Sequence, residues 1–256
     1  MKTKMELMEI KMKNKIVFLV ASVFIFCTGS LQAAVTTYSG ADLVTSAGDP
    51  SPSSAAAALA FDTDISSLGL IHTIDFESVP LGYAPVINLD ANTTAIFNGD
   101  IDPAYSGVTA SDDVVLGFNT TAGGRNHLRM SPTFGWTDAS VTLTFIEPVI
   151  AFGGYFTGLE ATIVGTVDVL FNDGSSESFA LGDLNKSFFG FTTDSSIMSV
   201  TFNEVNGGTG SLATREIWGM DDLVYVTASV PEASSILLLG LGLAGLGFSR
   251  RKKTSY

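Results

Sequence analysis

Apolar and polar residues alternate along much of the region between residues 35 and 229. Val141, Leu143 and Phe145 are separated by two threonines, and Met198, Val200 and Phe202 are spaced in the same way. A period of two places successive side chains on opposite faces of a strand. The pattern predicts strands at 73–77, 141–145, 163–171, 177–181, 198–202 and 223–226, with a turn at 172–175 that joins two of them as a hairpin.

Many short strands separated by glycine-containing turns predict an all-β fold, a single β-sandwich domain over residues 35–229. Within this domain a helix is expected only near 54–60, where Ser53 or Ser54 can cap an alanine-rich run.

The first 34 residues have the three parts of a secretory signal peptide. Lys13 and Lys15 precede an apolar run from Ile16 to Phe26, and small residues follow up to Ala33 and Ala34. Acidic residues before Met12 are unusual for such a signal, so translation can start at Met1 or at Met12. Cleavage would remove Cys27, the single cysteine of the chain, so no disulfide is expected to stabilise the exported domain.

The segment 230–253 combines a polar turn, an uncharged apolar run and a basic cluster. The run predicts one transmembrane helix at 234–249, and the positive charges of Arg250, Arg251, Lys252 and Lys253 should hold its end on the cytoplasmic side. An ordinary C-terminal membrane anchor is one interpretation of this pattern.

The tail also resembles the PEP-CTERM protein-sorting signal of Gram-negative bacteria. The resemblance rests on Val230, Pro231 and Glu232, on the leucine- and glycine-rich run after them, and on the four basic residues. The usual second proline of that family is Ala233 here. The resemblance implies that exosortase, a membrane-embedded protease, recognises and processes the tail, and that the protein is exported, transiently anchored in the inner membrane, and then placed at the cell surface or in the exopolysaccharide matrix.

The charge of the predicted domain is strongly negative. Residues 35–229 contain 4 Lys or Arg and 23 Asp or Glu, a net charge of −19. Nucleic-acid binding needs a basic face, so this balance excludes nucleic acid as a partner. It favours either divalent cations or simple solubility.

Two segments resemble the first and last strands of jelly-roll carbohydrate-binding modules: Ile74-Asp75-Phe76-Glu77 with Pro80 and Gly82 after it, and Trp218-Gly219-Met220-Asp221-Asp222-Leu223. The resemblance implies a jelly-roll-like β-sandwich with a structural Ca²⁺ held by Glu77 and by Asp221 or Asp222. Since adjacent strand residues point to opposite faces, only one of the two aspartates should face the ion. The alternative is that these carboxylates end strands and are solvated.

The sequence offers little support for catalysis, and we expect the protein not to be an enzyme. His72 and His127 have no zinc-ligand spacing, and no nucleophile elbow or phosphate loop occurs. The segment from Arg125 to Arg129 could bind sugar hydroxyls beside Tyr105 or Trp136, or its arginines could neutralise Asp112 and Asp113. The expected function is therefore a structural or binding component of the extracellular polysaccharide matrix; a calcium-supported carbohydrate-binding module and a polysaccharide-active enzyme are the alternatives.

Overall fold

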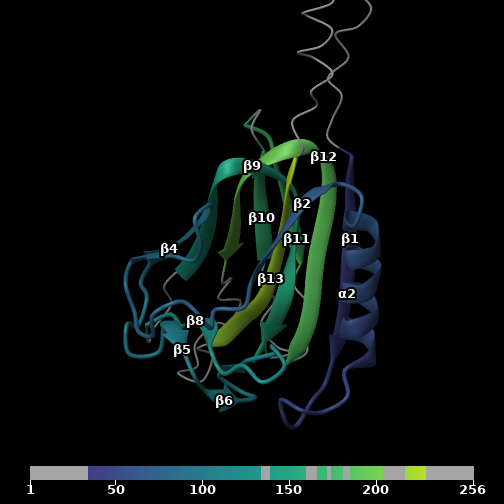
Figure 1. Cartoon of the computed structure of the whole chain (residues 1–256). Helices are drawn as coiled ribbons and strands as arrows, with labels where there is room; N and C mark the ends of the chain where they lie inside the picture. Colours follow the sequence, from purple (N-terminus) through teal and green to yellow (C-terminus); the bar gives the residue numbers. More distant parts are fainter. Residues whose placement is uncertain are drawn as a thin grey trace, which may run out of the picture. The chain divides into compact units, whose positions relative to one another are not determined.

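The computed structural model describes residues 34–133, 139–159, 166–171, 174–180, 185–203 and 217–228. Within them the chain forms one helix and thirteen strands (Figure 1). They are β1 (Val35–Asp42), α2 (Pro52–Ile65), β2 (Gly69–Ile74), β3 (Val86–Asn88), β4 (Thr93–Gly99), β5 (Gly107–Thr109), β6 (Asp112–Asp113), β7 (Gly117–Phe118), β8 (His127–Met130), β9 (Ala139–Thr157), β10 (Thr166–Phe171), β11 (Ser176–Ala180), β12 (Lys186–Asn203) and β13 (Trp218–Ala228).

Two long antiparallel strands, β9 and β12, take part in both layers of the fold. The first half of β9 pairs with β4 and with the end of β12, and the second half pairs with β13 and with the start of β12. The register of β9 and β12 shifts between Thr192 and Ser199, which bends the strands between their two halves.

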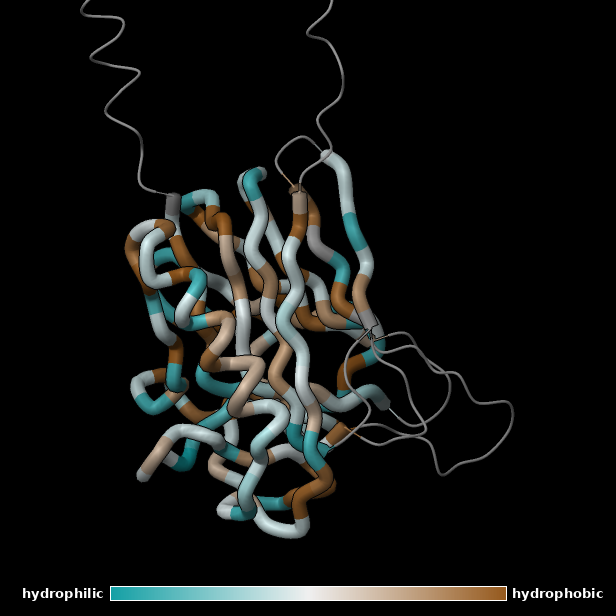
Figure 2. The backbone as a smooth tube through the Cα atoms, turned by 90° about the vertical axis from the view of Figure 1, so that its right-hand side faces the viewer, coloured by the Kyte–Doolittle hydropathy of each residue, from teal (hydrophilic) through white to brown (hydrophobic). Residues whose placement is uncertain are grey.

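The two halves build two sheet layers. The β4 layer contains β3, β4, residues 139–145 of β9, residues 199–203 of β12, β10 and β11. The β13 layer contains β5, β8, β2, β13, residues 149–157 of β9, residues 186–192 of β12, and β1. Figure 2 shows apolar and polar residues alternating along these strands.

Aromatic side chains fill the space between the layers. Phe202 of the β4 layer lies against Phe152, Phe156 and Trp218 of the β13 layer, with ring centroids 5.9, 5.1 and 6.1 Å apart. All four residues are at most 2% exposed. This packing confirms the predicted all-β sandwich, and it confirms that the apolar positions of 141–145 face a core.

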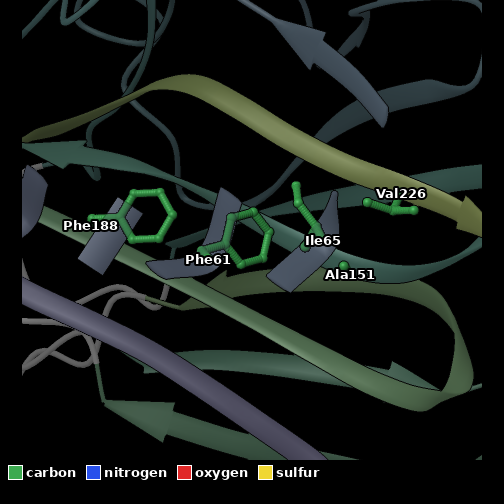
Figure 3. Packing of buried hydrophobic residues seen from close by; sticks show 5 residues of the cluster. All are labelled: Phe61, Ile65, Ala151, Phe188 and Val226. Carbon is green, nitrogen blue, oxygen red and sulfur yellow. The ribbon is translucent and has the colours of Figure 1, made fainter. Parts of the chain in front are cut away.

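Helix α2 covers the outer face of the β13 layer. Phe61 and Ile65 pack on Ala151, Phe188 and Val226, which come from β9, β12 and β13 (Figure 3). Glycines make room for the Phe61 ring, because a Cβ on Gly153 or Gly190 would lie 3.0 Å from it.

The helix is longer than the predicted segment 54–60 and is capped differently. It begins at Pro52, and its N-cap residue Ser51 makes no side-chain cap bond. Instead the backbone N–H groups of Ser53 and Ser54 donate to the carboxylate of Asp42, the last residue of β1. The cap comes from a neighbouring strand, and the packing of Phe61 and Ile65 extends the helix to Ile65.

Two other predictions of strand pattern are corrected. The strand predicted at 73–77 ends at Ile74, and Phe76 adopts a positive φ of 60°. Met198 is 46% exposed whereas Ile197 is fully buried, because the shift between Ile197 and Ser199 breaks the alternation before Val200. The hairpin at 172–175 is confirmed by the pairing of β10 with β11.

Among the described residues no helix is long and apolar enough to cross a membrane. Residues 1–33 of the predicted signal peptide lie outside the described residues. The predicted tail at 230–253, which includes the transmembrane helix at 234–249, also lies outside them.

Candidate functional site

Glu77 lies three residues after β2 and holds a loop that is far away in the sequence. Its Oε1 accepts hydrogen bonds from the backbone N–H groups of Arg125 and Asn126, at 2.6 and 2.7 Å, and from Nδ2 of Asn119 at 3.3 Å. Three N–H groups thus converge on one carboxylate oxygen. Glu77 therefore fixes the loop that connects β7 to β8.

The same loop is held from its other end by the aspartate pair of β13. Oδ2 of Asp221 accepts the backbone N–H groups of Thr120 and Thr121 at 2.6 and 3.1 Å. The hydroxyl groups of Thr120 and Thr121 donate to Asp222, at 2.8 and 2.6 Å. Glu77, Asp221 and Asp222 thus contact one loop, residues 119–126, which we call the clasped loop.

Both aspartates contact the clasped loop, although a regular strand would turn adjacent side chains to opposite faces. The Thr120 hydroxyl lies within hydrogen-bond distance of both Asp221 and Asp222. The pairing of β13 with β9 shifts between Asp221 and Val224, and Asp222 has a positive φ of 47°. A residue in the left-handed region breaks the alternation of a strand, so the two carboxylates converge.

Asp221 is completely buried, and its Oδ1 has no hydrogen-bond partner. Burial, followed by the charge of Asp222, raises the pKa of Asp221 to about 7, against the lowering effect of the loop N–H groups. A buried carboxylate oxygen without a partner costs free energy, so Oδ1 has the capacity to accept a proton or a cation.

Within the described ranges no three Asp, Glu, His or Cys side chains are grouped closely enough to hold a metal ion by themselves. A Ca²⁺ at the predicted residues would therefore need backbone carbonyl and hydroxyl oxygens of the clasped loop beside the carboxylates. Calcium at Glu77, Asp221 and Asp222 stays a prediction.

The two histidines are placed in separate environments. His127 begins β8, is 0% exposed, and neither ring nitrogen has a hydrogen-bond partner. Burial, and secondly the charge of Arg129, lower its pKa to about 4. His72 in β2 instead stacks on Tyr225 with ring centroids 4.7 Å apart. The structure therefore does not present His127 as a loop residue that contacts a sugar.

Arg129 lies over Tyr105 rather than free in a loop. Its Nε donates to the backbone carbonyl of Tyr105 at 2.7 Å, and its guanidinium carbon lies 5.8 Å from the centre of the Tyr105 ring. Tyr105 is 42% exposed, so this pair remains a candidate contact surface. Trp136 lies outside the described residues, and Trp218 is a core residue as expected.

A second candidate surface is the outer face of the β4 layer. The register aligns Ile96, Thr142, Thr201 and Asp168 in one row across four strands. Nδ2 of Asn98 donates to the Thr142 hydroxyl at 3.2 Å, and the Thr142 and Thr201 hydroxyls lie 3.0 Å apart. Three residues of this row are polar and Ile96 is apolar; all four are partly exposed, on strands about 4.8 Å apart.

Sequence reasoning missed both the clasped loop and this row. In the sequence Asn119, Thr120 and Thr121 form a polar triplet, and Asp221 lies 100 residues beyond Thr121. Local pattern carries no information about a partner at that separation. The row could have been found from the threonines at the polar positions of 141–145 and 198–202, which a correct strand register would have placed together.

The chain is similar to several solved structures. One is the family 11 carbohydrate-binding module of the cellulosomal cellulase Lic26A-Cel5E of Clostridium thermocellum, at 9% identity and a TM-score of 0.37, covering 63% of this chain and 97% of that one. Another is the CBM22-1 xylan-binding domain of Paenibacillus barcinonensis Xyn10C, at 16% identity and a TM-score of 0.33, covering 64% of this chain and 98% of that one.

The enzymatically active domain of Bacteriophage CBA120 tailspike protein 4 is also similar, at 18% identity and a TM-score of 0.34. The match covers 54% of this chain and 19% of that one. No curated protein matches the chain. Since these TM-scores lie below 0.5, the β-sandwich assignment rests on the strand pairing and the core packing described above.

The tail has a specific match. A family model described as the PEP-CTERM protein-sorting motif matches residues 229–252. The match contains Val230, Pro231 and Glu232, the apolar run, and three of the four basic residues. It confirms the resemblance found in the sequence, and the chain therefore carries a PEP-CTERM protein-sorting motif that marks it as cargo of that sorting system.

Proposed function

We propose that the protein is an exported substrate of exosortase whose β-sandwich acts as a non-enzymatic, carbohydrate-binding component of the cell surface or of the exopolysaccharide matrix. The sorting motif at residues 229–252 is the observation that carries the export and sorting part of this proposal. In this proposal residues 1–34 direct export, the helix at 234–249 holds the protein transiently in the inner membrane, and the tail is then processed.

The described residues support binding rather than catalysis. The candidate carboxylates Glu77 and Asp221 already accept backbone N–H groups of the clasped loop, which suits a structural role better than proton transfer. His127 is buried with a lowered pKa, so it is unsuited to exchange protons with a substrate in solvent. A polysaccharide-active enzyme is the alternative, and measurable release of reducing sugar by the purified protein would favour it.

The sorting step gives a direct test. Replacing Pro231 and Glu232 together with alanine should prevent recognition of the tail, so that unprocessed protein accumulates in the inner membrane. Immunoblotting of fractionated cells, with a C-terminal and an internal epitope, measures this. Replacing the exposed Leu59 with alanine serves as a control that should be processed normally. Equal processing of the Pro231 and Glu232 variant would contradict the proposal.

Calcium is a second part of the proposal, motivated by the unpartnered Oδ1 of Asp221. The carboxylates of Asp221 and Asp222 would bind the ion with oxygen atoms of the clasped loop, and Glu77 would keep that loop in place. Bound Ca²⁺ would neutralise the repulsion between the two carboxylates.

The expected result is a lower melting temperature in EDTA than in excess CaCl₂. A ligand at about 100 times its dissociation constant stabilises a fold by about 2.7 kcal/mol. Replacing both Asp221 and Asp222 with asparagine should abolish the difference between EDTA and CaCl₂. MgCl₂ at the same concentration controls for ionic strength. Identical melting of the unmodified protein in EDTA and CaCl₂ would exclude a structural calcium.

A further inference from the structure

The edge strands of the sheet differ in how well they resist pairing with another chain. In the ranges that the structure describes, β1, β2, β3, β5 and β11 lie at edges of the large sheet. β3 and β5 have three residues each, β11 carries Glu177, and the exposed residues of β1 are threonines and a serine. Short length and charged side chains discourage edge-to-edge pairing, and an edge without exposed apolar side chains offers a second strand little to bury.

Strand β2 has none of these protective features. It has six residues, Gly69–Ile74, and contains no Asp, Glu, Lys, Arg or Pro. Its side chains Leu70 and Ile71 are 65% and 43% exposed. All six residues pair with β13, and no other described strand pairs with β2. Since alternate residues of an edge strand direct N–H and C=O groups away from their neighbour, the other side of β2 presents a row of backbone groups that a further strand can bind.

The charge around this edge suits a second copy of the same strand. Residues 35–229 carry a net charge of −19, and the carboxylate that follows β2 in the chain is Asp75. In an antiparallel pair of two β2 strands, the two copies of Asp75 lie at opposite ends, about 20 Å apart or more. That distance exceeds the Debye length of about 8 Å at physiological ionic strength. Two acidic domains can therefore meet at β2 without bringing these carboxylates together.

The sorting tail follows directly from the strand that β2 pairs with. Ala228, the last residue of β13, pairs with Gly69, the first residue of β2, and the sorting motif begins at residue 229. In the proposed function the tail holds every copy in one membrane. Confinement of this kind raises the effective concentration of a partner without any new contact, and the partner that the tail concentrates is another copy of this chain.

We propose that two copies of the chain pair antiparallel through β2 and join their β13 layers into one continuous sheet. The proposal goes beyond the proposed function and rests on it only for the concentration of copies by the tail. A twofold axis perpendicular to the sheet relates such a pair, so residues opposite each other lie on the same face. The registers with the greatest overlap therefore place Ile71 opposite its own copy, or His72 opposite its own copy.

Cross-linking through single cysteines tests this geometry. In full-length protein Cys27, the single cysteine of the chain, is replaced with serine, and Ile71→Cys, His72→Cys or Leu59→Cys is added. Opposite residues of an antiparallel pair have Cα atoms about 4.5–5.5 Å apart, a distance that a disulfide spans. Leu59 on α2 is 68% exposed, more than Ile71, so it controls for random collision. The variants are oxidised in isolated membranes and in detergent and separated on non-reducing gels, and their melting temperatures verify folding.

We expect a cross-linked dimer from Ile71→Cys or from His72→Cys, and none above background from Leu59→Cys. Absence of a dimer from both folded β2 variants would overturn the proposal, and so would an equal amount of dimer from Leu59→Cys. Tail processing is measured in the same cells. Normal processing without the β2 cross-link would contradict self-association alone and leave the proposed function intact.

Lysine substitution gives an independent measurement of the same contact. Replacing Leu70 and Ile71 together with lysine should weaken the dimer about tenfold in sedimentation velocity, because both copies then bring two like charges to one strand pair. The matched control replaces Leu43 and Leu59, which are 76% and 68% exposed, with lysine and should dimerise normally. A dimer that persists in the β2 variant would place self-association elsewhere in the chain, and equal loss in both variants would assign it to exposed apolar side chains in general. Either result would overturn the proposal.

Discussion

Replacing Phe61 with alanine is expected to destabilise the domain by about 3–5 kcal/mol, the usual cost of removing a fully buried phenylalanine. Phe61 is 0% exposed, and its ring contacts Tyr38 and Phe188, with centroids 5.5 and 5.6 Å apart. It also fills the space left by Gly153 and Gly190. Its loss would leave a cavity between α2 and the β13 layer that neither glycine can fill.

Urea unfolding monitored by circular dichroism measures this effect, and hydrogen exchange should show α2 losing protection before the sheet. Leu59→Ala is the matched control on the same helix, because Leu59 is 68% exposed and should change stability by less than about 0.5 kcal/mol. Equal effects of the two substitutions would show that α2 does not depend on its contact with the sheet.

The pH dependence of stability should contain two opposite contributions of similar size. The pKa of Asp221 is raised from 3.8 to about 7, chiefly by burial, and the pKa of His127 is lowered from 6.5 to about 4, also chiefly by burial. Between about pH 4 and about pH 7 the folded state keeps a proton on Asp221 that the unfolded state releases, so stability falls as the pH rises.

His127 acts in the other direction. Between about pH 4 and about pH 6.5 the unfolded state binds a proton on His127 that the folded state excludes, so stability rises with pH. One proton changes the free energy of unfolding by at most about 1.4 kcal/mol per pH unit. The two contributions should therefore cancel in large part, and the unmodified protein should show a shallow profile from these groups.

Single substitutions should separate the two contributions. In EDTA, Asp221→Asn should become more stable relative to the unmodified protein as the pH rises from about 4.5 to about 6.5, by up to about 1.4 kcal/mol per pH unit. His127→Leu should show the opposite trend and gain most at the acidic end, because the unfolded variant has no His127 side chain to protonate. It also removes two unpartnered ring nitrogens from the core, a gain that does not depend on pH.

The measurement is the free energy of unfolding of each protein in urea at three pH values. Differences between variant and unmodified protein remove the contributions of the other carboxylates. Glu177→Gln on β11 is a control for the removal of one carboxylate in another part of the sheet. Parallel profiles for the unmodified protein and Asp221→Asn would mean that Asp221 is ionised in the folded state throughout.

Local pattern predicted much of the sheet. The alternation at 141–145 gave the correct buried face, since Val141, Leu143 and Phe145 are all at most 7% exposed. The hairpin of β10 and β11 was predicted by its turn residues, which act over a few positions. The sorting motif was also visible directly, because a sorting signal is a linear arrangement of turn, apolar run and charge.

Predictions failed where a distant part of the chain decides the local conformation. The start of α2 depends on Asp42 of the preceding strand, and its end depends on the packing of Phe61 and Ile65 on three other strands. Met198 could not be assigned to the correct face, because the register shift of β12 against β9 involves residues about 50 positions earlier.

The amino-acid sequence by itself determined the fold class, the acidic charge and the sorting motif, because each follows from composition or from neighbours in the chain. Only the tertiary structure decided that Asp221 and Asp222 converge on Thr120 and Thr121, and that Thr142 and Thr201 share one polar row. Both arrangements depend on strand register and on a positive φ at Asp222, which packing between distant segments fixes and which no local pattern encodes.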